Sequence, residues 1–271
     1  MTNWQEIDNN AKIWVKEAAE RIRASFPKTL DIQTKSNPND LVTNIDKETE
    51  QFFIEKIKAT YPEHKILGEE GYGDKLNQLA GVVWIIDPID GTMNFIHQQR
   101  NFAISIGIYE DGVGMIGLIY DVAHNELYHA FKGKGAYMND KKIPDLEQVP
   151  VTNAIVGISP SWLIENKRFD YKLLSKLVKD VRGTRSYGSA ALEMAYVATG
   201  RIDAYISLRL APWDVAGGAV IVKELGGLVT TLTGEELDFL TTGPVFVAKP
   251  GLHEQILQNY RFSERESPRR A

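Results

Sequence analysis

The sequence predicts a layered α+β protein made of two fused halves, residues 1–138 and 139–271. In the first half, amphipathic helical patterns give way to short apolar runs bounded by turn residues, as in an antiparallel sheet packed under helices. From about residue 139, strand-like and helix-like segments are mixed, which is typical of an α/β arrangement. Because no internal repeat or low-complexity linker interrupts the chain, we expect both halves to form one layered unit.

The first half opens with helices. Apolar residues recur at helical spacing over 4–26, and Pro27 ends this first helix. The polar stretch 31–41 predicts a mobile loop around Lys35. A second helix is expected over 46–60.

The remainder of the first half predicts strands. Two short apolar runs, 65–67 and 82–86, have the length of buried strands. An antiparallel meander follows, with turns marked by Asp111-Gly112 and Asn125. Its strands are expected over 102–109, 113–120 and 126–131.

In the second half, glycines follow two of the helical patterns, at Gly200 and at Gly226-Gly227. Strands are expected over 154–158, 203–207, 228–231 and 245–248. Helices are expected over 171–179, 189–199, 214–225 and 252–260.

Composition narrows the class of protein. The chain is 43% hydrophobic and 25% charged, as expected of a globular protein, and it contains no cysteine, which excludes disulfides and zinc–thiolate sites. A net charge of −5 argues against a general nucleic-acid binder, which needs clustered Lys and Arg. No leader-like start and no run of about 18 apolar residues is present. We therefore expect a cytoplasmic protein with no membrane and no nucleic-acid partner.

Carboxylates gather where predicted strands end. The run 82–86 leads into Asp87 and Asp90, the run 65–67 leads into Glu69-Glu70, and Asp214 begins a predicted helix. Acids brought together raise one another's pKa unless a cation neutralises them. With no cysteine and five scattered histidines, oxygen ligands predominate, and these select Mg²⁺, Mn²⁺ or Ca²⁺.

An anion site is expected beside these acids. Gly91-Thr92 opens a short helix whose free N–H groups suit a phosphate. Metal ions facing such a site fit phosphoryl transfer by in-line attack of water. Taken singly, each motif also has an ordinary structural explanation: a helix cap at Asp214, a solvated pair at Glu69-Glu70, and a turn at 87–91.

The order and spacing of these motifs resemble the inositol monophosphatase family, from about residue 35 to 227. Two further segments take part in the resemblance: 40–46 is similar to the stretch after the family's flexible metal-gating loop, and 188–191 to its substrate-contact segment. The motifs that carry it are Gly68-Glu69-Glu70, Asp87-Pro88-Ile89-Asp90-Gly91-Thr92-Met93-Asn94-Phe95 and Trp213-Asp214-Val215-Ala216-Gly217-Gly218.

The resemblance implies a five-layered αβαβα sandwich of the inositol monophosphatase/fructose bisphosphatase type. It also implies a lithium-sensitive, magnesium-dependent phosphatase of a small phosphate monoester, often a homodimer. Two to three Mg²⁺ per subunit are implied. Their ligands would be Glu69, Asp87 and the carbonyl of Ile89 for the first, Asp87, Asp90 and Asp214 for the second, and Glu69 with Glu70 close by for a weaker third.

The resemblance also assigns roles around the substrate. Thr92, oriented by Asp46, would help to activate the attacking water, and the loop around Lys35 would close over the site. Gly91 and Thr92 would donate to the phosphate. Further substrate contacts would come from Gly188, Ser189, Ala190 and Asp214. Most metal ligands then lie in 1–138, whereas Asp214 and the substrate contacts lie in 139–271.

The sequence departs from the inositol-specific pattern at two positions. Ser207 stands where those members usually carry a glutamate that binds sugar hydroxyls, and Arg209 stands where glycine is common. A cation there favours substrates with additional anionic groups, unless Arg209 points to solvent. We therefore expect NADP(H) or a sugar bisphosphate to be hydrolysed as well as myo-inositol 1-phosphate.

Other functions stay open. A fructose-1,6-bisphosphatase or a 3′-phosphoadenosine phosphatase would use the same acids. A two-metal nuclease would also need clustered acids, but the acidic chain lacks a basic groove. A regulatory binding protein could keep the fold without catalysis, although the intact acid set argues against loss of activity.

Overall fold

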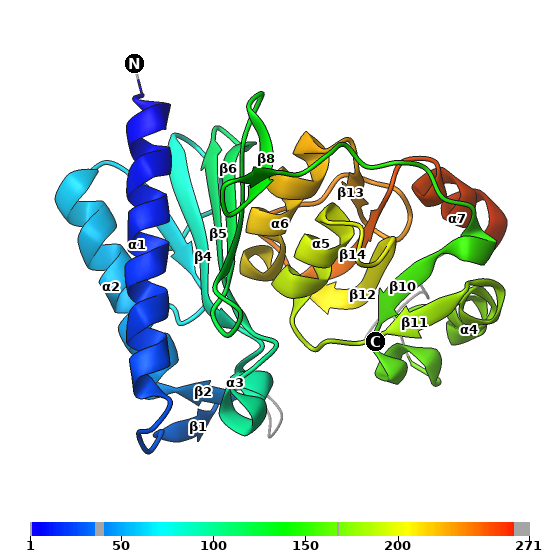
Figure 1. The fold of residues 1–271 in the computed structure, drawn as a ribbon, viewed down its shortest axis with the longest axis horizontal. Helices are drawn as coiled ribbons and strands as arrows, with labels where there is room; N and C mark the ends of the chain where they lie inside the picture. Colours follow the sequence, from blue (N-terminus) through cyan, green and yellow to red (C-terminus); the bar gives the residue numbers. More distant parts are fainter. Residues whose placement is uncertain (1, 36–40, 167, 263–271) are drawn as a thin grey trace, which may run out of the picture.

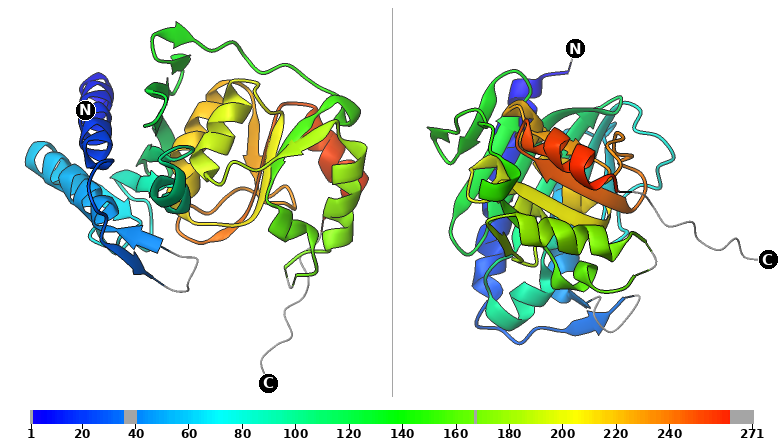
Figure 2. Two further views of the ribbon diagram at one scale, coloured as in Figure 1. Left: turned by 60° about the horizontal axis from the view of Figure 1, so that its bottom comes forward. Right: turned by 90° about the vertical axis from the view of Figure 1, so that its right-hand side faces the viewer.

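The computed structural model describes residues 2–35, 41–166 and 168–262. Figure 1 shows helices and sheets alternating across the molecule in layers, and a second view keeps the same order (Figure 2). The helices run over Trp4–Ser25 (α1), Asn44–Thr60 (α2), Thr92–Gln98 (α3), Tyr171–Asp180 (α4), Ala190–Ala198 (α5), Pro212–Glu224 (α6) and Leu252–Tyr260 (α7).

A seven-stranded sheet forms the second layer, with strand order β3-β4-β5-β6-β7-β8-β9. All its neighbouring strands are antiparallel except β3 and β4. Its strands are Lys65–Gly68 (β3), Val82–Asp90 (β4), Ala103–Glu110 (β5), Val113–Asp121 (β6), Glu126–Phe131 (β7), Gly135–Met138 (β8) and Lys141–Lys142 (β9).

A five-stranded mixed sheet forms the fourth layer, with strand order β11-β10-β12-β14-β13. Its strands β10, β11 and β12 are parallel to one another, and β14 is antiparallel to both its neighbours. These strands are Ile155–Ile158 (β10), Gly183–Arg185 (β11), Ala204–Leu210 (β12), Leu228–Thr230 (β13) and Gly243–Ala248 (β14).

Three hydrophobic cores fill the spaces between the layers, and the alternation of strand side chains explains their number. On β4, Trp84 and Ile86 pack under α1 and α2, whereas Val83 and Ile85 face α5 and α6. On β12, Tyr205 belongs to the α5–α6 core, and its neighbours Ala204 and Ile206 belong to the core under α4 and α7. The expected αβαβα sandwich is therefore confirmed.

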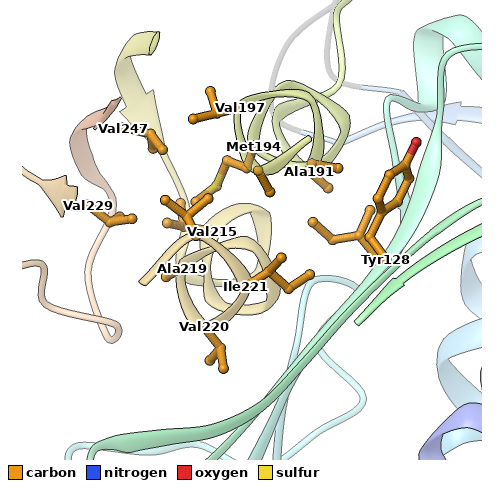
Figure 3. Close-up of a cluster of buried hydrophobic side chains, with 14 of the residues drawn as sticks. Tyr128, Ala191, Met194, Val197, Val215, Ala219, Val220, Ile221, Val229 and Val247 are labelled. Carbon is orange, nitrogen blue, oxygen red and sulfur yellow. The ribbon is translucent and has the colours of Figure 1, made fainter. Parts of the chain in front are cut away.

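Helices α5 and α6 are buried from both sides because they lie between two sheets. Figure 3 shows Met194 and Val215 packed between the two helices, with Val247 and Val229 on the side of the smaller sheet and Tyr128 on the other. A helix that is apolar all round is the pattern expected of such a position. Among the described helices, none is both long and apolar enough to cross a bilayer.

Some elements differ from the sequence-based expectation. The stretch 31–41 contains strand β1 (Ile32–Thr34), which pairs with β2 (Leu41–Thr43); residues 36–40 of the predicted loop lie outside the described residues. The strand predicted over 82–86 continues through Pro88, because β5 pairs with it at Asp87 and again at Asp90 around a bulge. Strands β8, β9 and β11 were not expected, since they depend on pairing partners rather than on local pattern.

Candidate active site

The bulge at the end of β4 directs two acids to one place. Asp87 and Asp90 are 1% and 8% exposed, and the Asp87 carboxylate accepts a hydrogen bond from the Ile89 N–H at 3.0 Å. Asp214 is the third residue of α6, where its carboxylate accepts from the Ala211 N–H at 2.8 Å. One carboxylate oxygen from each of the three acids lies within 4.8 Å of the others. The structure therefore brings Asp214 next to Asp87, although the two acids are 127 residues apart in the sequence.

Close packing of α6 on the large sheet makes this meeting possible. A Cβ atom on Gly117 of β6 would lie 2.3 Å from the Gly217 carbonyl oxygen of α6, so only glycine permits this approach. Two side chains of β5 hold the same helix: the Ser105 hydroxyl donates to the Trp213 carbonyl, and the Tyr109 hydroxyl donates to the Ala216 carbonyl. The first turn of α6, which carries Asp214, is thus anchored to the sheet.

The ionised form of the three acids is disfavoured by burial and by their mutual repulsion. Burial, opposed by hydrogen bonds from Ser189 and Ala191, raises the pKa of Asp90 to about 6. Burial also raises the pKa of Asp87 and Asp214 well above the usual range, and the neighbouring carboxylates add to both shifts. In the described part of the chain, no lysine, arginine or histidine forms an ion pair with any of the three. Buried oxygen ligands without a counter-charge fit a hard divalent cation.

Glu69 and Glu70 form the outer part of the site. The ammonium group of Lys35 lies 2.8 Å from a Glu69 oxygen and 2.7 Å from a Glu70 oxygen. Burial raises the pKa of Glu70 to about 7 against the effect of Lys35. The loop that carries both glutamates is held by Glu50, whose carboxylate accepts from the Glu70 N–H at 2.7 Å and the Tyr72 N–H at 3.0 Å.

Thr92 and Asp46 meet beside the acids, as the resemblance implies. The Thr92 hydroxyl lies 3.0 Å from an Asp46 oxygen and 3.1 Å from the Ile89 carbonyl. The other Asp46 oxygen accepts from the Thr43 N–H at 2.9 Å and the Thr43 hydroxyl at 2.6 Å. Asp46 is fully buried, and this burial raises its pKa although the bonds from Thr43 oppose the shift.

A cavity of about 220 Å³ opens next to Asp90. Ser207 lines it and is 5% exposed, but Arg209 is exposed and does not line it. The predicted substrate-contact residues Gly188, Ser189 and Ala190 do line this cavity, together with Ser159, Trp162, Glu193 and Tyr205.

Cavity size alone does not locate this site. Larger cavities, of about 710, 440, 300 and 250 Å³, lie elsewhere. The first lies between α1 and the strands β6–β8, and the second lies at the β5–β6 hairpin beside α6. None of these is lined by a member of the carboxylate cluster, so the chemistry of the lining residues favours the cavity next to Asp90.

Sequence reasoning missed three residues that support the site: Glu50, Asn94 and Glu193. Each had a signal in the sequence. Glu50 follows Asp46 by four residues and so shares its helix face. Glu193 is the one acid in the apolar run of α5, and Asn94 lies inside the motif after Asp90.

Comparisons with known proteins agree with this geometry. The sequence model of the inositol monophosphatase family matches residues 3–265. The chain is 62% identical to an inositol-1-monophosphatase of Bacillus subtilis over 260 residues, which cover 96% of this chain and 98% of that protein.

Solved structures give the same result. An inositol monophosphatase II from Staphylococcus aureus superposes with a TM-score of 0.87 at 44% identity, covering 94% of this chain and 95% of that chain. An IMPase/NADP phosphatase complexed with NADP and Ca²⁺ reaches a TM-score of 0.88 at 29% identity, covering 95% and 96%. The chain therefore belongs to the inositol monophosphatase family and is a metal-dependent phosphatase.

Proposed function

We propose that this protein hydrolyses myo-inositol 1-phosphate in a magnesium-dependent reaction. The observation that carries the proposal is the cluster of Asp87, Asp90 and Asp214, of which the first two are buried and the third is half-buried. Asp90 lines a cavity, and Thr92, which pairs with Asp46, bonds to Ile89 between the first two acids. The inositol-1-monophosphatase of Bacillus subtilis, at 62% identity, supports the same substrate.

The acids would hold the metal. We assign Glu69, Asp87 and the Ile89 carbonyl to one Mg²⁺ and Asp87, Asp90 and Asp214 to a second, with Glu70 near a third. When bound, Mg²⁺ lowers the pKa of a coordinated water and neutralises charge on the phosphoryl oxygens. The IMPase/NADP phosphatase, also solved with Mg²⁺ and phosphate, supports this choice of metal.

Thr92 and Asp46 would prepare the attacking water. Asp46 accepts the Thr92 hydroxyl proton in a hydrogen bond, which leaves a lone pair of the Thr92 oxygen free to accept from the water. Because Thr43 fixes the other oxygen of Asp46, the acceptor for the Thr92 hydroxyl is held in place by the fold. The N–H groups of Gly91 and Thr92 would donate to the phosphate.

The leaving group would occupy the cavity beside Asp90. Gly188, Ser189, Ala190 and Ser207 line it, and Asp90 joins it to the acid cluster. Asp214, the remaining predicted substrate contact, would reach the substrate from the cluster rather than from the cavity lining. Lys35 would close the outer side, where it already neutralises Glu69 and Glu70. As a metal at Glu69 and the Lys35 ammonium use the same carboxylate, closure and metal loading are expected to influence each other.

The test is phosphate release from myo-inositol 1-phosphate with Mg²⁺ and with EDTA. We expect release that EDTA abolishes. Asp90→Asn, which removes one acid but keeps the shape, should fold and show no turnover. An active, metal-dependent Asp90→Asn protein would contradict the proposal.

We propose NADP(H) as a second substrate, which Ser207 favours. Arg209 is exposed and lies outside the cavity lining, so it could contact only a part of the substrate that extends beyond the cavity. Ser207 supplies no acid to the cavity, so this cavity repels an additional phosphate less than the inositol-specific pattern would. A Staphylococcus aureus relative at 42% identity, SaIMPase-II, has been solved with 2′AMP bound. The test is Arg209→Ala, which should reduce NADP⁺ hydrolysis more than inositol phosphate hydrolysis; equal losses would contradict a role for this arginine.

The same assay separates the remaining alternatives. Fructose 1,6-bisphosphate and 3′-phosphoadenosine 5′-phosphate, added as substrates, would rank the related phosphatase activities. Inhibition by Li⁺ is expected, and a staphylococcal inositol monophosphatase-1 of 29% identity was solved as a LiCl-soaked inhibitory complex. A homodimer is expected in solution. Absence of release from every substrate would favour the regulatory binding protein.

A further inference from the structure

The segment before α5 is held by side chains rather than by regular secondary structure. Tyr187 lies between β11 and α5, and both of its backbone polar groups have side-chain partners. The Asn94 amide of α3 donates to the Tyr187 carbonyl at 2.7 Å. The Tyr187 N–H donates to the Glu193 carboxylate of α5, also at 2.7 Å. One residue from each half of the molecule therefore holds the backbone of Tyr187, on both sides of its Cα atom.

The residues that follow connect this segment to the acid cluster. Gly188 adopts a left-handed conformation with φ of 77°, and a Cβ atom there would lie 3.0 Å from the Asn94 amide nitrogen. The Ser189 hydroxyl then donates to one oxygen of Asp90, and the Ala191 N–H donates to the same oxygen at 2.7 Å. The position of this segment thus decides how the Asp90 carboxylate is turned.

Glu193 is an unusual residue for its place in α5. It is 3% exposed, and burial raises its pKa to about 7. Its second carboxylate oxygen has no hydrogen-bond partner within the described residues. Burying a carboxyl group with one unsatisfied oxygen costs free energy, which a hydrogen bond to its other oxygen must offset. The bond to Tyr187 is the one that the structure offers.

Asn94 also contributes beyond a single bond. Its amide donates to the Asn101 carbonyl at 2.8 Å as well as to Tyr187, so it joins the end of α3 to the segment before α5. The Tyr187 ring packs edge-on against Tyr196 of α5, with ring centroids 4.8 Å apart. Tyr187 is thus in contact with Asn94, Glu193 and Tyr196.

We propose that Asn94 and Glu193 are positioning residues, which clamp Tyr187 so that Ser189 turns the Asp90 carboxylate into its metal-binding orientation. This inference rests on the proposed function, because it takes Asp90 as a metal ligand. Asn94 does not line the proposed substrate cavity, whereas Glu193 does, so Mg²⁺ binding rather than turnover is the measure of this role. Their effect passes through the segment 187–191.

The test uses the full chain and Mg²⁺ alone as the probe. Thermal denaturation is followed as Mg²⁺ is titrated, in the wild type, Asn94→Ala, Glu193→Ala and Glu193→Gln. We expect the Mg²⁺ concentration for half-maximal stabilisation to rise about ten-fold in the two alanine variants, as when other supports of metal ligands are removed. Glu193→Gln retains an acceptor for the Tyr187 N–H and should stay within about threefold of wild type.

The control is Glu224→Ala, which removes a carboxylate that accepts from the Gly133 and Gly135 N–H groups in a hairpin away from the site. Its Mg²⁺ response should match wild type. Equal weakening in this control, or a Glu193→Gln variant as weak as Glu193→Ala, would overturn the proposal. If Glu193→Ala does not fold, Ser189→Ala tests the last link and should show the same ten-fold change.

Hydrogen exchange separates this inference from the proposed function. In the metal-free protein, amides 188–191 should exchange faster in Glu193→Ala than in wild type, with Glu224→Ala unchanged. Unchanged exchange in Glu193→Ala would overturn the clamp. Faster exchange in a protein that shows no response to Mg²⁺ would instead keep the clamp and reject the metal site.

Discussion

At the scale of single residues, the role of the Thr92 hydroxyl depends on neighbours that the fold holds in place. It has one proton and lies within hydrogen-bond distance of both Asp46 and the Ile89 carbonyl. Because Thr43 holds the Asp46 carboxylate, the Thr92 hydroxyl has an acceptor at a fixed position beside it. Its contribution should therefore appear in the rate of the chemical step rather than in binding.

We expect Thr92→Ala to lower kcat about 100-fold, the lower range for loss of a proton-transfer partner. KM for myo-inositol 1-phosphate should change little, since the hydroxyl is not required to hold the ground state. Thr92→Ser keeps the hydroxyl and is the matched control, with a much smaller loss expected. Steady-state kinetics at saturating Mg²⁺ measure both constants. A rise in KM with kcat preserved would assign Thr92 to substrate binding instead.

At the scale of elements, the sequence predicts best what depends on local pattern. The helix predicted over 252–260 matches α7, and the first helix and the central meander strands are placed within a few residues. The course of β4 through Pro88 was not predicted, because it depends on pairing with β5 around a bulge. The pairing of β1 with β2 and the edge strand β11 were missed for the same reason.

The site divides in a similar way. The carboxylates at the ends of predicted strands could be found from sequence alone, and the family resemblance related Asp46 to Thr92. The supports at Glu50, Asn94 and Glu193 were not found. Each of them accepts from or donates to backbone groups of another segment, and local sequence pattern does not predict which segment that is.

The contact between α6 and the large sheet gives a prediction at this scale. Gly117→Ala would place a Cβ atom 2.3 Å from the Gly217 carbonyl and push α6 away. We expect a loss of about 1–3 kcal/mol in the free energy of unfolding, as for other overpacked cores. Weaker Mg²⁺ binding should accompany it, because Asp214 moves with the helix.

Gly243→Ala is the matched control, since a Cβ on this strand glycine meets nothing within 4 Å. Chemical denaturation and a Mg²⁺ titration on both variants measure the two effects. Normal Mg²⁺ binding in a destabilised Gly117→Ala protein would show that Asp214 does not depend on this contact.

At the scale of the whole molecule, the buried acids couple stability to pH. The pKa values of Asp90 and Glu70 are raised to about 6 and about 7 in the folded state. Between their unfolded and folded pKa values, the folded metal-free protein binds more protons than the unfolded chain. Its stability is therefore greatest at low pH within this range and falls as the pH rises towards 7.

Mg²⁺ should remove this loss, because it compensates the ionised acids. We expect Mg²⁺ to raise the denaturation temperature more at pH 8 than at pH 5.5. The measurement is thermal denaturation with and without Mg²⁺ at both values. Asp90→Asn should lessen the pH dependence of the metal-free protein, whereas an equal Mg²⁺ effect at both pH values would argue against a titrating metal site.

The position of α5 and α6 between the two sheets has a consequence for biosynthesis. The face of the large sheet that carries Val83, Ile85 and Tyr128 is covered by helices that begin only at residues 190 and 212. At translation rates of about 5–20 residues per second, the strands of the large sheet are synthesised several seconds before α5 and α6. Until these helices are made, the apolar face of the sheet has no cover within the chain, so the nascent protein is expected to be prone to aggregation during this interval.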